Sequence, residues 1–218
     1  MTPANPLGHL SRLQLSAVPA NHPTLVARRF DWRDQAEVHR AVMSLFPAVL
    51  PGPVGEKRAE STILYRLENP TSGPRILIQS LVPLLASEHD IPTTSLEGLV
   101  STLSPGVALT FRLDVNAVRS QSRSGKRVPV PLDEIPRFLL DEADRDRPGL
   151  LRGAVTELEL FETIIDIRRS GATPLRVAAI SGIAKVADPG LLSALIVKGI
   201  GRGKSYGCGL LTVAPRLS

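Results

Sequence analysis

Residues 199–209 read GIGRGKSYGCG, and this glycine-rich segment limits the possible folds more than any other stretch. The residues before it predict a helix, because Asp188 is a suitable N-cap, Pro189 suits the first helical position and apolar residues follow at helical spacing. Residues 210–214 predict a strand. The segment therefore leads out of a helix and into a strand, and its glycines allow the positive φ angles of a tight connection.

The same segment predicts an anion-binding loop, because two cations lie among glycines whose bare N–H groups can approach a phosphate. Two common nucleotide motifs fail here. A P-loop needs a glycine where this chain has Lys198, and it runs from a strand into a helix. A dinucleotide fingerprint would need its third glycine at Lys204 or Tyr206. The alternative is a helix C-cap followed by a flexible turn. The predicted phosphate-contacting residues are Gly199, Gly201, Arg202, Gly203, Lys204, Ser205 and Tyr206.

The order of predicted elements in the second half is β-α-β-β-α-β. Strands are expected at residues 107–115, within 150–167, within 175–186 and at 210–214, with helices at 135–144 and 191–198. This order is that of a ferredoxin-like unit.

The first half fits the same order less completely. Strands are expected at residues 10–17, 63–67 and 75–81, and Asp34 marks the start of a helix that ends before Pro47. Residues 92–103 fit either a strand or a short helix, and the second helix is weak or missing. We predict an α+β protein of two tandem ferredoxin-like (RRM-like) domains with antiparallel sheets, one over residues 1–104 and one over residues 105–218.

Composition narrows the class of partner. A net charge of +5 and a pI of about 9.9 favour an anionic partner, and only 4% aromatic residues disfavour recognition by many stacked bases. A single cysteine, Cys208, excludes an internal disulfide framework and a cysteine-rich zinc site, and we expect it to be a small buried residue. No apolar run reaches the length of a membrane span, so we expect a soluble, cytoplasmic protein.

One histidine and one basic segment are candidate functional groups. His39 lies in the first predicted helix beside an apolar stripe, where a packed histidine is the more common finding than a catalyst. The histidines share no metal-ligand spacing, so no metal site is indicated. Residues 115–132 hold no acidic residue and form a polar loop or hairpin whose arginines suit phosphate recognition. Its candidate RNA-binding cations are Arg119, Arg123, Lys126 and Arg127.

Four stretches together resemble a known family, the CasE type of CRISPR-associated endoribonuclease, which processes precursor RNA in type I-E Cascade. The stretches are residues 10–13, the helix end HRAVMSLFP at 39–47, FRLDVNAVRSQSRSGKRVPV at 111–130 and GIGRGKSYGCGLL at 199–211. The resemblance implies two ferredoxin-like domains, no cofactor, and cleavage without metal at the 3′ base of the stem-loop of CRISPR repeat RNA. It also implies that the crRNA product is retained with the other Cascade subunits.

The resemblance implies a catalytic role for His39 as general base or acid. The ribose 2′-OH would attack the adjacent phosphate and leave a 2′,3′-cyclic phosphate and a 5′-OH. Some family members carry a tyrosine one helical turn earlier, where this chain has Ala36. If that hydroxyl aligns the 2′-OH, another group must serve here, for example Tyr206 or Ser205 of the glycine-rich loop. Two other functions stay open: a non-catalytic scaffold that binds an RNA hairpin, and a nucleotide-dependent enzyme.

Overall fold

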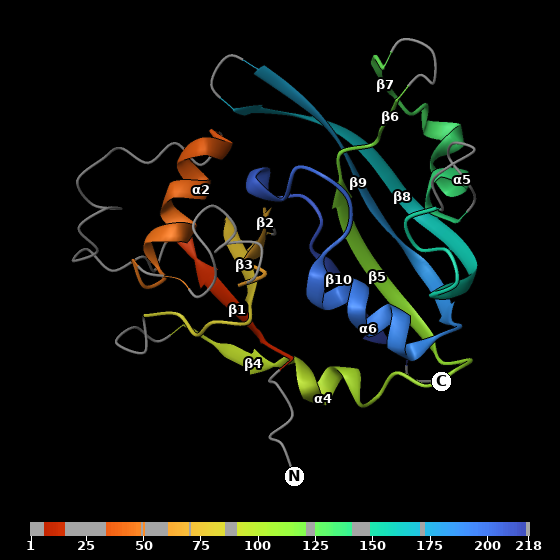
Figure 1. Cartoon of the computed structure of the whole chain (residues 1–218), viewed down its shortest axis with the longest axis horizontal. Helices are drawn as coiled ribbons and strands as arrows, with labels where there is room; N and C mark the ends of the chain where they lie inside the picture. Colours follow the sequence, from red (N-terminus) through yellow and green to blue (C-terminus); the bar gives the residue numbers. More distant parts are fainter. Residues whose placement is uncertain are drawn as a thin grey trace.

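The computed structural model describes residues 7–15, 34–48, 50, 61–69, 71–85, 91–120, 125–140, 149–170 and 173–216. These residues form two four-stranded sheets and one two-stranded hairpin, and all paired strands are antiparallel (Figure 1). The expected α+β class with antiparallel sheets is confirmed. None of the described helices is both long and apolar enough to cross a membrane.

The first sheet has the strand order β2-β3-β1-β4. Its strands are β1 (His9–Gln14), β2 (Leu64–Glu68), β3 (Arg75–Ser80) and β4 (Thr93–Ser95). Helix α2 (Gln35–Ser44) covers one face, and its Val38 and Val42 pack against Tyr65, Ile76 and Ile78. The Asp34 side chain accepts a hydrogen bond of 2.8 Å from the Ala36 N–H, which confirms the predicted N-cap.

Residues 92–103 contain both structures that the sequence allowed. Strand β4 is followed at once by helix α4 (Leu96–Val100), with Ser95 as its N-cap. Residues 81–85 and 91–92, the described part of the connection from β3 to β4, contain no helix. The first unit therefore keeps the strand order of a ferredoxin-like fold, and a helix appears after its fourth strand.

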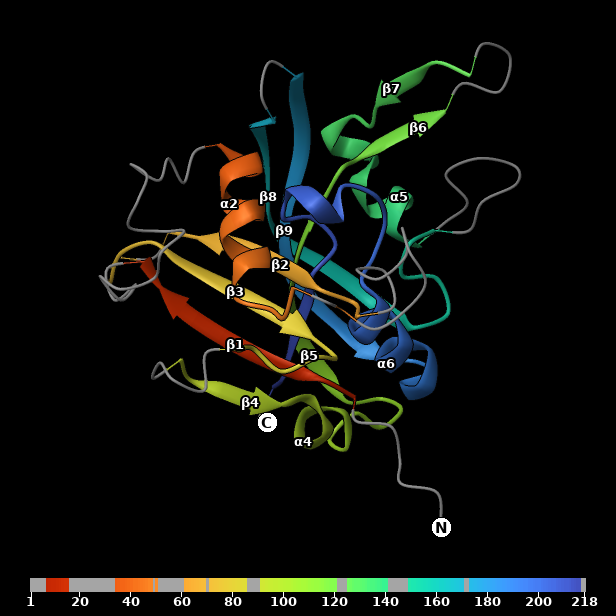
Figure 2. The same ribbon diagram turned by 60° about the vertical axis from the view of Figure 1, so that its left-hand side comes forward.

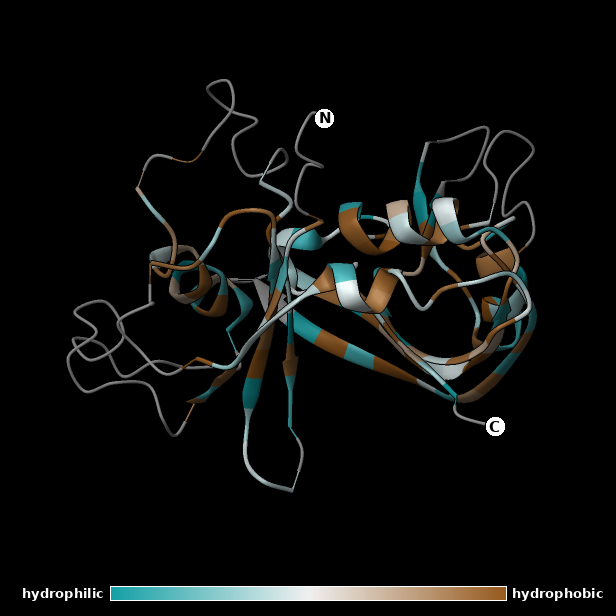
Figure 3. Cartoon of the chain, turned by 90° about the horizontal axis from the view of Figure 1, so that it is seen from below, coloured by the Kyte–Doolittle hydropathy of each residue, from teal (hydrophilic) through white to brown (hydrophobic). Residues whose placement is uncertain are grey.

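The second sheet has the equivalent order, β10-β5-β9-β8. Its strands are β5 (Ala108–Val115), β8 (Val155–Ser170), β9 (Thr173–Val186) and β10 (Leu211–Pro215). Helices α5 (Ile135–Leu140), preceded by a 3₁₀ turn η3 (Leu132–Glu134), and α6 (Pro189–Lys198) cover one face (Figure 1). Hydrophobic and hydrophilic residues alternate along the strands of this sheet, as expected when one face packs against helices (Figure 3).

A hairpin of β6 (Val118–Ser120) and β7 (Arg127–Pro129) extends from the second unit between β5 and α5 (Figure 2). It is the polar hairpin predicted within residues 115–132. Residues 121–124 at its tip lie outside the described residues, and Arg123 is one of them.

The two sheets meet through the second face of the first sheet. Leu64 and Leu77 form a small buried cluster with Leu210, and Gln79 Nε2 donates a 2.7 Å hydrogen bond to the carbonyl of Ile196 at the end of α6. The strands of one sheet lie within residues 9–95 and those of the other within residues 108–215. We propose the boundary near Ser104 as the limit between two domains.

Candidate functional site

His39 and the glycine-rich loop meet at Tyr65. The His39 ring stacks on the Tyr65 ring with 6.3 Å between centroids and 20° between planes. Tyr65, on β2, is fully buried, and its hydroxyl donates a 2.5 Å hydrogen bond to the carbonyl oxygen of Ser205. Ser205 lies in the 3₁₀ turn η4 (Lys204–Tyr206), and α2 contacts this turn directly (Figure 2). Three segments far apart in the sequence therefore form one candidate site.

The glycines of the loop are required by close packing as well as by positive φ angles. Gly199 is the C-cap of α6 at φ +70°, and a Cβ there would lie 2.6 Å from a methyl group of Leu64. At Gly207, at φ +73°, a Cβ would lie 3.2 Å from the Tyr65 ring and 3.3 Å from Gln35 Oε1. The C-cap that the sequence allowed is thus present, and the loop that follows it is tightly packed against the first unit.

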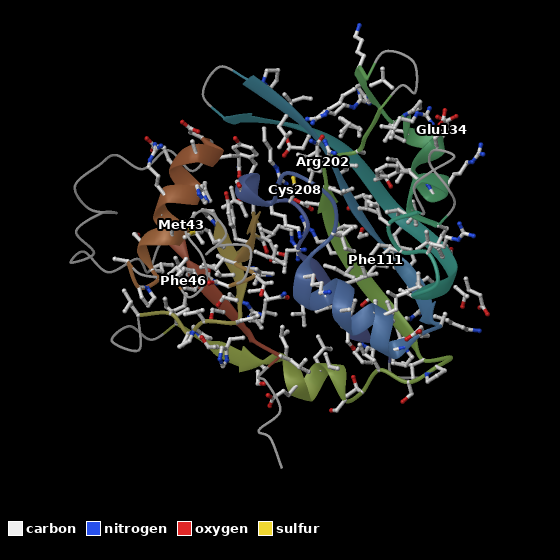
Figure 4. The ribbon with its side chains drawn as sticks, viewed as in Figure 1. Met43, Phe46, Phe111, Glu134, Arg202 and Cys208 are labelled. Atoms are coloured by element: carbon white, nitrogen blue, oxygen red, sulfur yellow. The ribbon has the colours of Figure 1, made fainter. Side chains whose placement is uncertain are left out.

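The predicted cations of the loop have different surroundings. Arg202 is exposed, on the side of the loop near the start of the β6–β7 hairpin (Figure 4). Lys204 Nζ donates a 2.6 Å hydrogen bond to the carbonyl of Lys198, which ties it to the end of α6. Of these two cations, Arg202 is therefore better placed to meet a ligand, and Lys204 braces the turn.

The hairpin cations also differ. Arg119 pairs with Glu134 of the turn η3, with 2.6 Å between Nη1 and Oε2. Lys126 and Arg127 are exposed beside the hairpin tip. Residues 115–132 contain no acidic residue, but the fold brings the Glu134 side chain to the hairpin from just beyond that stretch.

The sequence does not predict a buried ionic network that lies beneath the glycine-rich loop. Arg168 on β8 donates to the carbonyl of Gly207 at 3.1 Å and to Oδ2 of Asp114. Burial opposes the charge of Arg168, but Asp114, Cys208 and Asp166 together outweigh this effect and raise the pKa of the guanidinium. The backbone of Asp114 also accepts a 2.7 Å hydrogen bond from Gly209 N–H. Strands β5 and β8 therefore fix the loop through hydrogen bonds to the backbone of Gly207 and Gly209.

Cys208 is fully buried at the end of the loop, as predicted (Figure 4). Burial raises the pKa of its thiol to about 12, although the nearby Arg168 acts in the opposite direction. The side chain is thus a packed apolar group beneath the turn.

Comparison with known proteins identifies the family. Residues 9–215 match the family described as CRISPR associated protein. This chain belongs to that family. It is 29% identical over 212 residues to the CRISPR-associated endoribonuclease Cse3 of Thermus thermophilus, covering 89% of this chain and 96% of that protein. It is 24% identical over 209 residues to the Cascade subunit CasE of Escherichia coli, covering 88% and 96%.

Solved structures of the CRISPR-associated family share the fold. Cse3 bound to a 19-nucleotide RNA has a TM-score of 0.66 and 23% identity, covering 95% of this chain and 100% of that one. Cas6e from Escherichia coli has a TM-score of 0.62 and 22% identity, with the same coverage. The predicted resemblance and the paired ferredoxin-like architecture are confirmed. The roles of individual residues stay predictions.

Proposed function

We propose that this CRISPR-associated protein is a metal-independent endoribonuclease. It binds the stem-loop of CRISPR repeat RNA, cleaves at the 3′ base of the stem, and retains the crRNA product as a Cascade subunit. The names of its relatives support the reaction class, since Cse3 is called an endoribonuclease and CasE a Cascade subunit. The observation that carries the proposal is the placement of His39, which Tyr65 connects to the turn η4 of the glycine-rich loop.

The geometry supports cleavage by an internal nucleophile. The His39 imidazole accepts the proton of the ribose 2′-OH, whose oxygen attacks the adjacent phosphorus. The bond from phosphorus to the 5′ oxygen breaks, which gives a 2′,3′-cyclic phosphate and, after the leaving oxygen takes up a proton, a 5′-OH. Arg202 and the N–H groups of the loop offset the charge on the non-bridging oxygens. The β6–β7 hairpin binds the stem through Arg119, Lys126, Arg127 and the arginine at position 123.

The test is cleavage of a cognate repeat hairpin in excess EDTA. We expect the parent protein to cut the RNA once, and the new ends to be a 5′-OH and a cyclic phosphate that resists phosphatase until acid opens it. Replacing His39→Ala should slow single-turnover cleavage by about 10²- to 10⁴-fold with hairpin binding retained. Arg40→Ala is the matched control, because Arg40 is the exposed neighbour on the same helix and pairs only weakly with Glu37 at 3.4 Å.

The outcomes separate the alternatives. If the parent protein binds the RNA but does not cut it, the protein is a non-catalytic scaffold that binds an RNA hairpin. Cleavage that survives His39→Ala would remove the assignment of this residue while leaving the activity. Cleavage that stops in EDTA and returns with a divalent cation would contradict metal independence.

A further inference from the structure

The glycine-rich loop starts at the C-terminal end of α6, and this helix end has no role in the cleavage scheme above. The last four carbonyls of a helix lack partners within the helix, so they need donors from other groups. In α6 these carbonyls belong to residues 195–198. All four accept a hydrogen bond, and the donors for three of them are side chains outside the helix. The end of α6 is therefore fixed by residues from other segments of the chain.

Gln79 of β3 supplies the donor for two of these carbonyls. Its Nε2 donates to the carbonyl of Ile196 at 2.7 Å and to the carbonyl of Val197 at 3.3 Å. Gln79 is only 2% exposed, so this contact lies inside the packing of the first sheet against α6. Removing such a buried donor would leave the two carbonyls unsatisfied, which is costly. The unit that carries His39 thus fixes the helix from which the loop starts.

Lys204 supplies the donor for the last carbonyl of the helix. Its Nζ lies 2.6 Å from the carbonyl oxygen of Lys198. A cation at this end of a helix also interacts favourably with the helix dipole. Lys204 is the first residue of η4, and the next residue, Ser205, accepts the hydrogen bond from Tyr65. The lysine therefore connects the end of α6 to the turn that contacts α2 (Figure 2).

We propose that Gln79 and Lys204 are positioning residues for RNA cleavage. The proposal rests on the proposed function, because it concerns where the loop holds the scissile phosphate relative to His39. Gln79 fixes the end of α6 against the first sheet, and Lys204 fixes η4 against the end of α6. The sequence predicts Lys204 as a phosphate contact, and the proposal replaces that role with one inside the protein. A small displacement of the phosphate is enough to slow a reaction strongly.

The experiment compares single-turnover cleavage of the cognate repeat hairpin with binding of an uncleavable hairpin that carries a 2′-deoxy sugar at the scissile nucleotide. In Lys204→Gln we expect the rate at saturating protein to fall about tenfold and the dissociation constant to change less than about twofold. The slope of log affinity against log salt should stay unchanged, whereas loss of a phosphate contact would lower it by close to one unit.

Two further variants control for the charge and the donor of Lys204. Lys204→Arg keeps a cationic donor and should restore the rate to within about threefold of the parent. Lys198→Gln is the matched control, because it removes the same charge from the last turn of α6 and leaves the backbone acceptor in place. This control should cleave at the rate of the parent.

Gln79→Met tests the donor from the first sheet, since methionine has a similar length and no N–H group. We expect cleavage to slow about tenfold, again with the dissociation constant nearly unchanged. Gln14→Met is the control, because it makes the same change on β1, opposite Arg75 in the sheet. Urea unfolding of each variant defines conditions in which all are folded. Both residues act through the end of α6, so the double variant should lose less than the product of the two single effects.

Cleavage by Lys204→Gln and Gln79→Met at the rate of the parent would overturn the proposal. A salt slope that falls by one unit in Lys204→Gln would assign this lysine to a phosphate and overturn its positioning role. Parallel losses of rate and affinity in both variants would assign the contacts to stability alone. A parent protein that does not cut the hairpin would contradict the proposed function itself, and that result differs from all three.

Discussion

At the scale of single residues, Tyr65 determines how His39 is presented. Its ring stacks on the imidazole and its hydroxyl reaches the backbone of Ser205, so one side chain fixes both the histidine and the turn η4. The family resemblance points to Ala36 as the position that lacks a tyrosine, and it suggests Tyr206 or Ser205 as a replacement. The structure places a tyrosine at the same site from β2 instead. We propose Tyr65 as a positioning residue, because its side chain is fully buried and contacts both His39 and Ser205.

Replacing Tyr65→Phe tests this role, because phenylalanine keeps the stacked ring and removes only the hydroxyl. We expect single-turnover cleavage to slow by about tenfold, because the turn η4 loses one hydrogen bond near the reacting phosphate, with the hairpin dissociation constant changed less than about twofold. Ser80→Ala is the control, since it also removes a hydroxyl that donates to a backbone carbonyl, that of Val82 at 2.6 Å. Parallel losses of rate and affinity would mean that Tyr65 acts only on stability.

At the scale of elements, local signals in the sequence predicted most of the fold. The sequence predicts Asp34 and Asp188 as the N-caps of two helices. Both side chains accept a hydrogen bond from the first turn of their helix. The strand at residues 107–115 and the helix at 191–198 agree with β5 and α6 to within about two residues. Contacts between elements were not predictable in this way. Arg168, Asp114 and Tyr65 sit in ordinary strand patterns, and their roles follow only from the pairing of β8 with β9 and the docking of the loop on β2.

The β6–β7 hairpin is the element that should dominate salt dependence. Each phosphate neutralised adds close to one unit to the slope of log affinity against log salt. We expect the Arg119→Ala, Arg123→Ala, Arg127→Ala triple variant to lower this slope by about two to three units. Among single variants, Arg127→Ala should weaken binding more than Arg119→Ala, because Arg119 already pairs with Glu134 in the free protein. Arg216→Ala, which removes an exposed arginine near the C-terminus, is the control. An unchanged slope in the triple variant would exclude the hairpin as a phosphate contact.

At the scale of the whole molecule, a buried ionic cluster joins the two sheets. Arg66 on β2 is 1% exposed and donates to the carbonyls of Arg112 and Leu210 and to the hydroxyl of Thr212. Glu68, 6% exposed, accepts from Arg66 at 2.8 Å and from Arg75 at 2.8 Å. The position of the first sheet against β5 and β10, and thus of His39 against the loop, depends on this cluster.

The cluster predicts a loss of stability in acid. Burial alone would raise the pKa of Glu68, but Arg66 and Arg75 outweigh it and hold this pKa below its usual value of 4.5. A carboxylate whose pKa is lower in the folded state than in the unfolded state stabilises the fold. This contribution to the free energy of unfolding is complete above the unfolded-state pKa and is lost as the pH falls through the folded-state pKa. Glu68→Gln should therefore lower the free energy of unfolding by about 3 kcal/mol at pH 7, because Arg66 loses its charged partner.

Urea unfolding over a pH series measures this effect. Below pH 4.5 the parent should approach the Glu68→Gln variant, because protonation also makes the carboxyl neutral. Glu37→Gln is the control, since Glu37 forms an exposed pair with Arg40 that should contribute less than about 1 kcal/mol, and this variant should keep the pH dependence of the parent. A gap between parent and Glu68→Gln that stayed constant with pH would show that the loss comes from packing, and the charge of Glu68 would then not hold the two sheets together.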